Sequence, residues 1–213
     1  MAIVRDDITQ RSPEWFEATL GNLGASDISK IITDKGEPSK QATDYRRQLV
    51  GEIITGQRDE TFKSIHMEKG IIREDSTRAL FEMLYDVEVR QVGLVYKDEQ
   101  KKFHCSPDGL VGDNAGFEQK NPMMKTQVKY LESGKLPQEY FSQVQMSLYT
   151  CEREYWWFVS RYAPFMPGYK PLQLLILKIG RDDEFITKLE GVLEDFCYSL
   201  SSAVKKLKEL KTV

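Results

Sequence analysis

Two acidic residues and a lysine stand close together in a segment that suits metal-dependent chemistry. Asp108 lies ten residues before Glu118, and Lys120 follows two positions later. Side chains alternate between the faces of a β-strand, so Glu118 and Lys120 share one face while Gln119 points to the other. A hairpin that brings Asp108 beside Glu118 would place two carboxylates and a nearby backbone carbonyl in a site that suits Mg²⁺.

Such a site could hydrolyse phosphodiesters. Lys120 would orient or deprotonate the water that attacks phosphorus, and its charge would offset the negative charge that builds in the transition state. The alternative is an aspartate in a turn and an exposed Glu-x-Lys on an edge strand, because so short a pattern also arises by chance. Neighbouring features must decide between the two.

The elements expected around this segment are helices at both ends of the chain and strands in the middle. The predicted helices span 12–20, 26–32, 40–55 with a cap at Gly56, 66–85, 137–152 and 182–211. The predicted strands span 87–96, 102–105, 110–111 and 116–120, which form a meander, and then 155–162 and 172–179. This order predicts one α/β domain over residues 1–213, with a mixed central β-sheet flanked by α-helices.

The helix expected over 66–85 is amphipathic. Apolar residues recur on one side of it and predict its buried stripe: Ile72, Ala79, Leu80, Met83 and Leu84.

The overall composition excludes disorder and fibrous structure. Of the 213 residues, 40% are hydrophobic and 30% charged, which is enough apolar material for a core. Thirty Lys and Arg against 33 Asp and Glu give a net charge of −3, so the whole chain has no electrostatic attraction to nucleic acid. Any DNA site must therefore be local.

The cysteines and the apolar runs argue against two other classes of protein, those with a structural metal cluster and those that span a membrane. Cys105, Cys151 and Cys197 are widely spaced, and with only two histidines they argue against a structural zinc or iron–sulfur site. The longest apolar stretch, 174–177, is too short to span a bilayer. We expect a soluble protein of a reducing, cytoplasmic compartment, with no membrane partner.

An ordered set of motifs resembles the lambda exonuclease family, the YqaJ-like alkaline exonucleases of phage recombination within the PD-(D/E)XK nuclease superfamily. The set extends from Trp15 to about Tyr162. Its members are Glu14-Trp15, Leu20-Gly21, Ala25-Ser26, Gly70, Glu74, Ala79-Leu80-Phe81-Glu82, Ser106-Pro107-Asp108-Gly109-Leu110, Glu118-Gln119-Lys120-Asn121-Pro122, Gln143-Val144-Gln145, Leu148-Tyr149 and Trp156-Trp157-Phe158.

The resemblance implies the restriction-endonuclease-like core of that superfamily and a Mg²⁺-dependent exonuclease, with Mn²⁺ as a possible substitute. It would degrade one strand of linear double-stranded DNA from the 5′ end and leave a 3′ overhang for phage recombination by single-strand annealing. The implied assembly is a homo-oligomer, a trimeric ring around the duplex. Its implied partners are double-stranded DNA ends and a phage single-strand annealing protein, in the cytoplasm of a phage-infected or prophage-carrying bacterium.

Catalytic roles follow from the same resemblance. Asp108 and Glu118 would bind the metal, with the backbone carbonyl of Gln119 as a third ligand, and Lys120 would be the catalytic lysine. Glu74 would join them, directly or through a metal-bound water. The alternative for Glu74 is a surface pair with Arg78, four residues later on the same helix.

DNA-binding candidates are Ser26, Gln143, Ser106 and Arg11. Ser26 could cap a helix whose free amides accept a phosphate, although it could equally be an ordinary N-cap. Gln143 lies on the helix with Gln145-x-x-x-Tyr149, an element that in RecB-like members of the superfamily supports the site and touches DNA. A plain amphipathic helix has the same spacing, and Tyr149 fits core packing better than DNA contact.

One position departs from the family. Members often have an arginine four residues after the tryptophan, where it holds the terminal phosphate, and this chain has Thr19 there. Arg11, Lys30, Arg46 and Arg47 could substitute, although each could also be a solvated surface charge.

Two rival functions remain. One is another PD-(D/E)XK activity, such as an endonuclease or a repair nuclease; the absence of a four-cysteine cluster argues against its iron–sulfur members. The other is a catalytically idle DNA-end-binding protein, which has no need to keep Asp108, Glu118 and Lys120 together.

Overall fold

The computed structural model of the chain describes residues 1–58, 65–162 and 172–210, without the side chains of residues 65–74. Its strands are β1 (Ile3–Arg5), β2 (Leu23–Gly24), β3 (Leu94–Tyr96), β4 (Phe103–Cys105), β5 (Gly109–Val111), β6 (Ala115–Lys120), β7 (Tyr155–Ser160) and β8 (Leu175–Gly180). Its helices are α1 (Pro13–Thr19), α2 (Ala42–Thr55), α3 (Ile65–Tyr85), α4 (Met124–Ser133), α5 (Phe141–Cys151) and α6 (Asp183–Glu209), with the 3₁₀ helices η1 (Ala25–Lys30) and η2 (Gln138–Tyr140).

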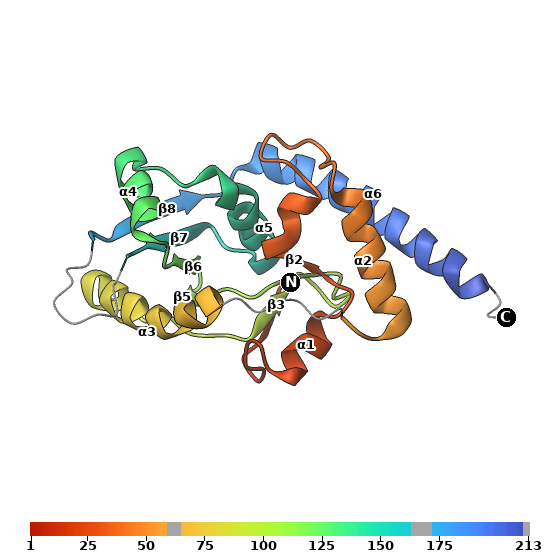
Figure 1. The fold of residues 1–213 in the computed structure, drawn as a ribbon, viewed down its shortest axis with the longest axis horizontal. Helices are drawn as coiled ribbons and strands as arrows, with labels where there is room; N and C mark the ends of the chain where they lie inside the picture. Colours follow the sequence, from red (N-terminus) through yellow and green to blue (C-terminus); the bar gives the residue numbers. More distant parts are fainter. Residues whose placement is uncertain (59–64, 163–171, 211–213) are drawn as a thin grey trace.

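The strands form two mixed sheets, and the expected mixed α/β class is confirmed. One sheet has the order β1-β3-β4-β2 and the other the order β5-β6-β7-β8. The strands expected as one meander are therefore divided, with β3 and β4 in the first sheet and β5 and β6 in the second. An isolated bridge between Arg90 and Leu110 connects the two. Figure 1 shows the second sheet between α3 on one side and α4 and α5 on the other.

Helix ends follow local rules where the sequence predicts them. The Ser12 side chain accepts a hydrogen bond from the backbone N–H of Trp15, and Pro13 occupies the first turn of α1. Gly56 ends α2 in the left-handed conformation, with φ 68°. The expected cap at Gly56 is confirmed.

The helix α4 was not predicted from the sequence. Its buried face includes Gln127, whose side-chain amide donates to the carbonyls of Ser160 (3.0 Å) and Gln173 (2.9 Å). A polar residue at a core position conceals the apolar period by which helices are recognised. The hydrogen bonds of Gln127 satisfy its amide, so its burial costs little.

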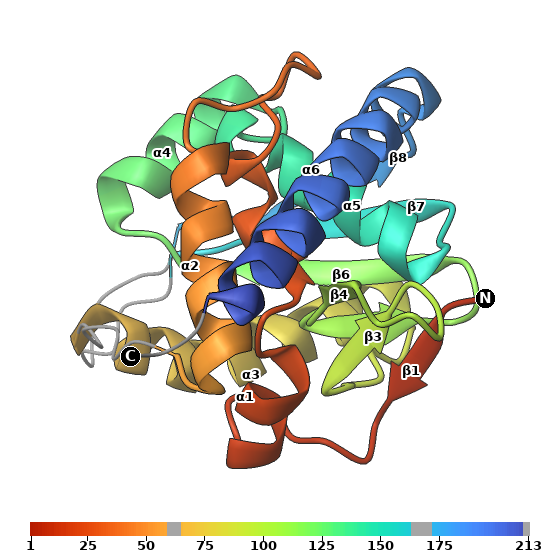
Figure 2. The same ribbon diagram turned by 90° about the vertical axis from the view of Figure 1, so that its right-hand side faces the viewer.

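The core between β7, α5 and α6 depends on large side chains. Trp156 and Phe158 are fully buried on one face of β7. Gly116 on β6 is required beside them, because a Cβ there would lie 2.1 Å from the Trp156 ring. Along α6 the buried residues Phe185, Leu189 and others recur at helical spacing, and Figure 2 shows α6 crossing α2 and α5.

The buried stripe predicted for α3 is wrong over the part whose side chains are described. Ala79 is exposed, and Met83 and Leu84 are 72% and 56% exposed. The buried face instead contains Phe81, whose ring packs 5.0 Å from that of Phe117 on β6. Aromatic partners on the sheet, rather than the hydrophobicity of α3, decide which side of the helix is buried.

No helix in the described ranges is long and apolar enough to cross a membrane.

Gly93 allows the loop after β1 to pack against the start of β3. A Cβ on Gly93 would lie 2.0 Å from the carbonyl oxygen of Ile8, which is backbone and cannot rotate away. We expect Gly93→Ala to lower the free energy of unfolding by about 1–3 kcal/mol, the usual cost of overpacking. Urea unfolding measures this. The control is Gly191→Ala in α6, where a Cβ meets nothing within 4 Å and stability should hold or rise. Equal stability of both variants would contradict the close approach.

Candidate active site

The β5–β6 hairpin brings the first acidic residue to the end of β6. Its antiparallel register pairs Gly109 with Phe117, so Asp108 stands opposite Glu118. The backbone N–H of Gln119 donates to Oδ2 of Asp108 at 2.8 Å. The hairpin therefore holds Asp108 beside Glu118 and Lys120.

Glu118 is a buried carboxylate with two donors on one oxygen. It is 5% exposed, and its Oε1 contacts the Lys120 ammonium and accepts a hydrogen bond from Nε2 of Gln143 at 3.1 Å. No hydrogen bond reaches Oε2 from the described part of the chain. The carboxylate is thus held in place through one oxygen.

Lys120 is surrounded by groups that favour its charged form. Burial alone would lower the pKa of Lys120, but the negative charges of Glu118 and Asp108 outweigh it and raise the pKa above its ordinary value. The ammonium also lies 4.9 Å from the centre of the Tyr140 ring. Lys120 was expected either to orient or to deprotonate the attacking water. An ammonium that keeps its proton suits orientation of the water and charge stabilisation better than proton abstraction.

The α5 helix contributes Gln143 to the site and uses Gln145 elsewhere. The side chain of Gln145 is buried, donates to the carbonyl of Gly180 at 3.0 Å and accepts from the backbone N–H of Asp182 at 2.9 Å. These bonds join α5 to the start of α6. Tyr149 is half-buried and packs against Phe103, as a packing residue should.

The residues present fit a hard divalent cation in donor type. Asp108 and Glu118 offer carboxylate oxygens next to the same lysine, and such oxygens are the ligands that Mg²⁺ and Mn²⁺ accept. Within the described residues no group of three Asp, Glu, His or Cys side chains is placed to hold a metal ion. The Glu74 side chain lies outside the described residues, so its role stays a prediction. The role of the Gln119 carbonyl as a metal ligand also stays a prediction.

Arg78, the surface partner expected for Glu74, also contacts a described neighbour. It donates to Oδ1 of Asp75 at 2.7 Å, three residues earlier on α3. The pair of Glu74 with Arg78 stays an alternative, because the Glu74 side chain lies outside the described residues.

Ser106 and Arg11 lie close to Asp108 in different ways. The Ser106 hydroxyl accepts a hydrogen bond from Nε1 of Trp15 at 2.8 Å. Arg11 is exposed, has an unusual φ of 66°, and lines a cavity of about 350 Å³ together with Asp108 and Gln119. The side-chain oxygen of Gln119 is buried there without a hydrogen-bond partner among the described residues.

The expected N-cap at Ser26 is wrong. The helix is η1, a six-residue 3₁₀ helix that begins at Ala25, with Gly24 as its N-cap and no side-chain cap bond. Ser26 lies inside this short helix, and the His104 ring lies close to Gly24, where an added Cβ would be 3.0 Å from Nε2 of His104. Burial, together with the positive charge of Arg58, lowers the pKa of His104 to about 4. Ser26, His104 and Arg58 thus share one neighbourhood.

Arg58, which the sequence analysis did not consider, lies against Thr19. Thr19 is buried, and its carbonyl accepts a hydrogen bond from Nη2 of Arg58 at 3.0 Å. The same nitrogen lies 3.3 Å from the buried carboxylate of Glu52. A guanidinium therefore stands beside the position where the family arginine was expected, but it comes from the end of α2. No motif in the sequence predicts this contact, which joins residues 39 positions apart.

Three of the four cations suggested as substitutes are engaged elsewhere. Arg47 pairs with Asp44 on the exposed side of α2 at 2.6 Å, and Lys30 pairs with Asp27 at 2.8 Å. Arg46 contacts α6. None of these contacts directs the side chain toward Thr19.

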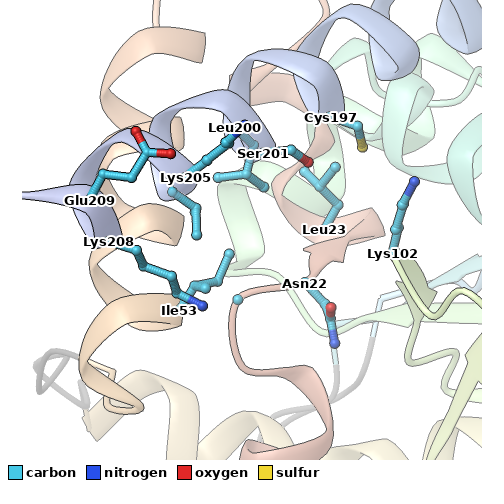
Figure 3. A pocket seen from close by; sticks show the side chains of 12 residues that line it. Asn22, Leu23, Ile53, Lys102, Cys197, Leu200, Ser201, Lys205, Lys208 and Glu209 are labelled. Atoms are coloured by element: carbon cyan, nitrogen blue, oxygen red, sulfur yellow. The ribbon is translucent and has the colours of Figure 1, made fainter.

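A separate cavity of about 620 Å³ lies between α6, the end of α2 and β2 (Figure 3). Its walls are mainly apolar, with Leu23, Ile53 and Leu200 among them, and Lys102 and Lys208 stand at its edge. Asp108, Glu118 and Lys120 do not line it. The lining of this cavity includes no pair of carboxylates. The candidate catalytic site is therefore the one at the β5–β6 hairpin.

Known exonuclease structures resemble this fold. The crystal structure of an alkaline exonuclease (LHK-Exo) from Laribacter hongkongensis has a TM-score of 0.81 and 28% identity, covering 92% of this chain and 96% of that one. LHK-Exo in complex with dAMP gives a TM-score of 0.80 and 29% identity over the same shares. A phage-related exonuclease from Haemophilus somnus 129PT has a TM-score of 0.61, covering 87% of this chain and 96% of that one, and at 13% identity it supports the fold alone.

The family is established over most of the chain. None of the curated proteins matches the sequence significantly. Residues 14–154, which contain the hairpin and α5, match the family described as YqaJ-like viral recombinase domain. Together with the structural neighbours this supports a nuclease and confirms the resemblance to the alkaline exonucleases. The chain belongs to the YqaJ-like viral recombinase domain family.

Proposed function

We propose that the protein is a Mg²⁺-dependent exonuclease, with Mn²⁺ as a substitute, that degrades one strand of linear duplex DNA from the 5′ end. The observation that carries this proposal is the meeting of Asp108, Glu118 and Lys120 at the end of the β5–β6 hairpin. Two carboxylates for a cation and an ammonium for a phosphate are the groups that hydrolysis of a phosphodiester requires.

Each residue has a task in this proposal. Lys120 and Gln143 fix Glu118 through Oε1, which leaves Oε2 for a cation. The Gln119 amide fixes Asp108 in the same way through Oδ2. A bound divalent cation would polarise the scissile phosphate and lower the pKa of its water. Lys120 then holds a positive charge beside the phosphoryl oxygens as negative charge develops on them.

The test uses linear duplex DNA labelled at either end, with and without a 5′ phosphate, beside a covalently closed circle. We expect loss of the 5′-ended strand alone, dependence on Mg²⁺, and no cutting of the circle. Cutting of the circle would favour the endonuclease alternative. Binding without cutting at any metal concentration would favour the idle DNA-end-binding protein.

Recognition of the 5′ phosphate is assigned to the neighbourhood of Thr19. Arg58 brings a guanidinium there, and its positive charge acts on His104. We expect Arg58→Gln to reduce the ratio of rates on 5′-phosphorylated and 5′-hydroxyl ends by about 10-fold, the worth of one charged hydrogen bond. Arg58→Gln also leaves the buried Glu52 without its ion pair, which can lower stability. The ratio of rates on the two kinds of end is independent of how much of the enzyme is folded. Arg47→Gln, which removes an exposed arginine of α2, should leave the ratio unchanged; an unchanged ratio in Arg58→Gln would refute the assignment.

The biological role in this proposal is production of 3′ overhangs for phage recombination by single-strand annealing in the bacterial cytoplasm. A trimeric ring around the duplex and an annealing protein as partner belong to the same proposal. Its support is the viral recombinase family and the large apolar side chains exposed on α3 and α4, such as Met83 and Met124, which a subunit contact would cover. Light scattering coupled to size exclusion measures the subunit number.

A further inference from the structure

One glutamine outside the proposed site holds the chain immediately before Asp108. Gln10 lies in the loop between β1 and α1 and is half-buried. Its side-chain amide uses both hydrogens, donating to the carbonyl of Pro107 at 2.7 Å and to that of Val92 at 3.0 Å. Gln10 therefore connects the start of the chain, the segment before β3 and the segment before β5.

The first of these bonds acts on the peptide that leads into Asp108. The Pro107 carbonyl and the Asp108 nitrogen belong to one planar group, so fixing the carbonyl fixes the direction from which the Asp108 side chain leaves the backbone. The carboxylate itself is held by the Gln119 amide at 2.8 Å. Trp15 adds a third restraint through its 2.8 Å bond to Ser106.

A cavity beside this peptide explains why the hydrogen bond from Gln10 matters for the position of Asp108. Gln10, Asp108 and Gln119 line the cavity of about 350 Å³ described above. Asp108 borders this cavity, so there is open space on its side of the Pro107–Asp108 peptide. Without the amide of Gln10, the peptide could rotate toward the cavity or bond to water, and the Asp108 carboxylate would move with it.

The loop that carries Gln10 has its own anchors. Ile8 is buried against Leu94 and Tyr96, and the close approach to Gly93 holds the backbone. The loop therefore does not depend on the Gln10 amide for its position. A substitution at Gln10 should change the orientation of Asp108 more than it changes folding.

We propose that Gln10 is a positioning residue that orients Asp108 for binding of the divalent cation. This inference rests on the proposed function, in which Asp108 is a metal ligand. Groups that orient metal ligands are typically worth 10- to 100-fold in metal affinity.

The test is Gln10→Met, which keeps the length of the side chain and removes both donors. Titration of the DNA-free protein with Mn²⁺, followed by electron paramagnetic resonance, should show affinity weakened by about 10-fold. The Mg²⁺ concentration for half-maximal cleavage should rise by a similar factor, while the rate at saturating Mg²⁺ stays near that of the unaltered protein. Gln10→Asn, whose amide is one methylene too short to reach both carbonyls, should weaken Mn²⁺ binding in the same direction.

The control is Gln91→Met. Gln91 is exposed, lines the same cavity and makes no bond to Pro107, so its loss should leave Mn²⁺ affinity unchanged. All titrations are made at a temperature where circular dichroism shows each variant folded. Unchanged Mn²⁺ affinity in both Gln10 variants would overturn the inference.

Asp108→Ala in the same titration distinguishes failure of the positioning role from failure of the proposed metal site. If it weakens Mn²⁺ binding and the Gln10 variants do not, the positioning role fails and the proposed metal site stands. If Asp108→Ala binds Mn²⁺ as the unaltered protein does, the metal site fails, and the inference about Gln10 fails with it.

Discussion

A Lys120→Met protein is expected to bind linear duplex DNA nearly as well as the unaltered protein and to cleave it about 10³-fold more slowly. Removal of the ammonium takes away the charge that faces the phosphoryl oxygens, whereas the methionine stem retains contact with the Tyr140 ring. Single-turnover cleavage at saturating Mg²⁺, beside a filter-binding measurement, separates the chemical step from binding.

The matched control for Lys120 is Lys129→Met on the exposed side of α4. It removes the same charge from a surface position and should change cleavage little. A Lys120→Met protein with the activity of the unaltered protein would remove the catalytic assignment. A Lys120→Met protein that no longer binds DNA would instead show that the lysine contacts the ground state.

Asp108→Asn should cost as much as the loss of the lysine, for a different reason. The asparagine oxygen can still accept from the Gln119 amide, so the hairpin keeps its hydrogen bond while the site loses a negative charge. We expect Mn²⁺ affinity to fall by at least about 100-fold, because loss of a ligand should cost no less than the largest losses for groups that only orient ligands, and cleavage to fall with it. Isothermal titration with Mn²⁺ and the cleavage assay measure the two effects.

Comparison with Asp108→Ala separates charge from hydrogen bonding. The alanine also leaves the Gln119 amide without its acceptor, so it should lower the melting temperature more than the asparagine does, at similar metal affinity. Asp113→Asn, an exposed aspartate in the turn of the same hairpin, is the control and should bind metal normally. Full Mn²⁺ affinity in Asp108→Asn would exclude the carboxylate as a ligand.

Local sequence rules predicted the features whose causes lie within a few residues. The Ser12 and Gly56 caps depend on their own helices, and the shared face of Glu118 and Lys120 follows from strand alternation. The β5–β6 hairpin belongs to the same class. These are the parts of the fold for which sequence neighbours are also neighbours in space.

Features decided by tertiary contacts were not predictable in the same way. The buried face of α3 packs against Phe117, which lies on a strand of the sheet. The positions of Arg58 against Thr19 and of Gln10 against Pro107 have no periodicity or motif that would announce them. Each joins segments that are distant along the chain.

Gln10 also bears on how quickly an active molecule can arise. The contacts that orient Asp108 join residues separated by 97 positions for Gln10 and 91 for Trp15, so they form only after long loops have closed. Folding rates fall as such non-local contacts increase. During refolding, regain of helical circular dichroism should therefore precede regain of metal binding, because α2 and α5 need only local contacts whereas the cation site needs both ends of this long loop.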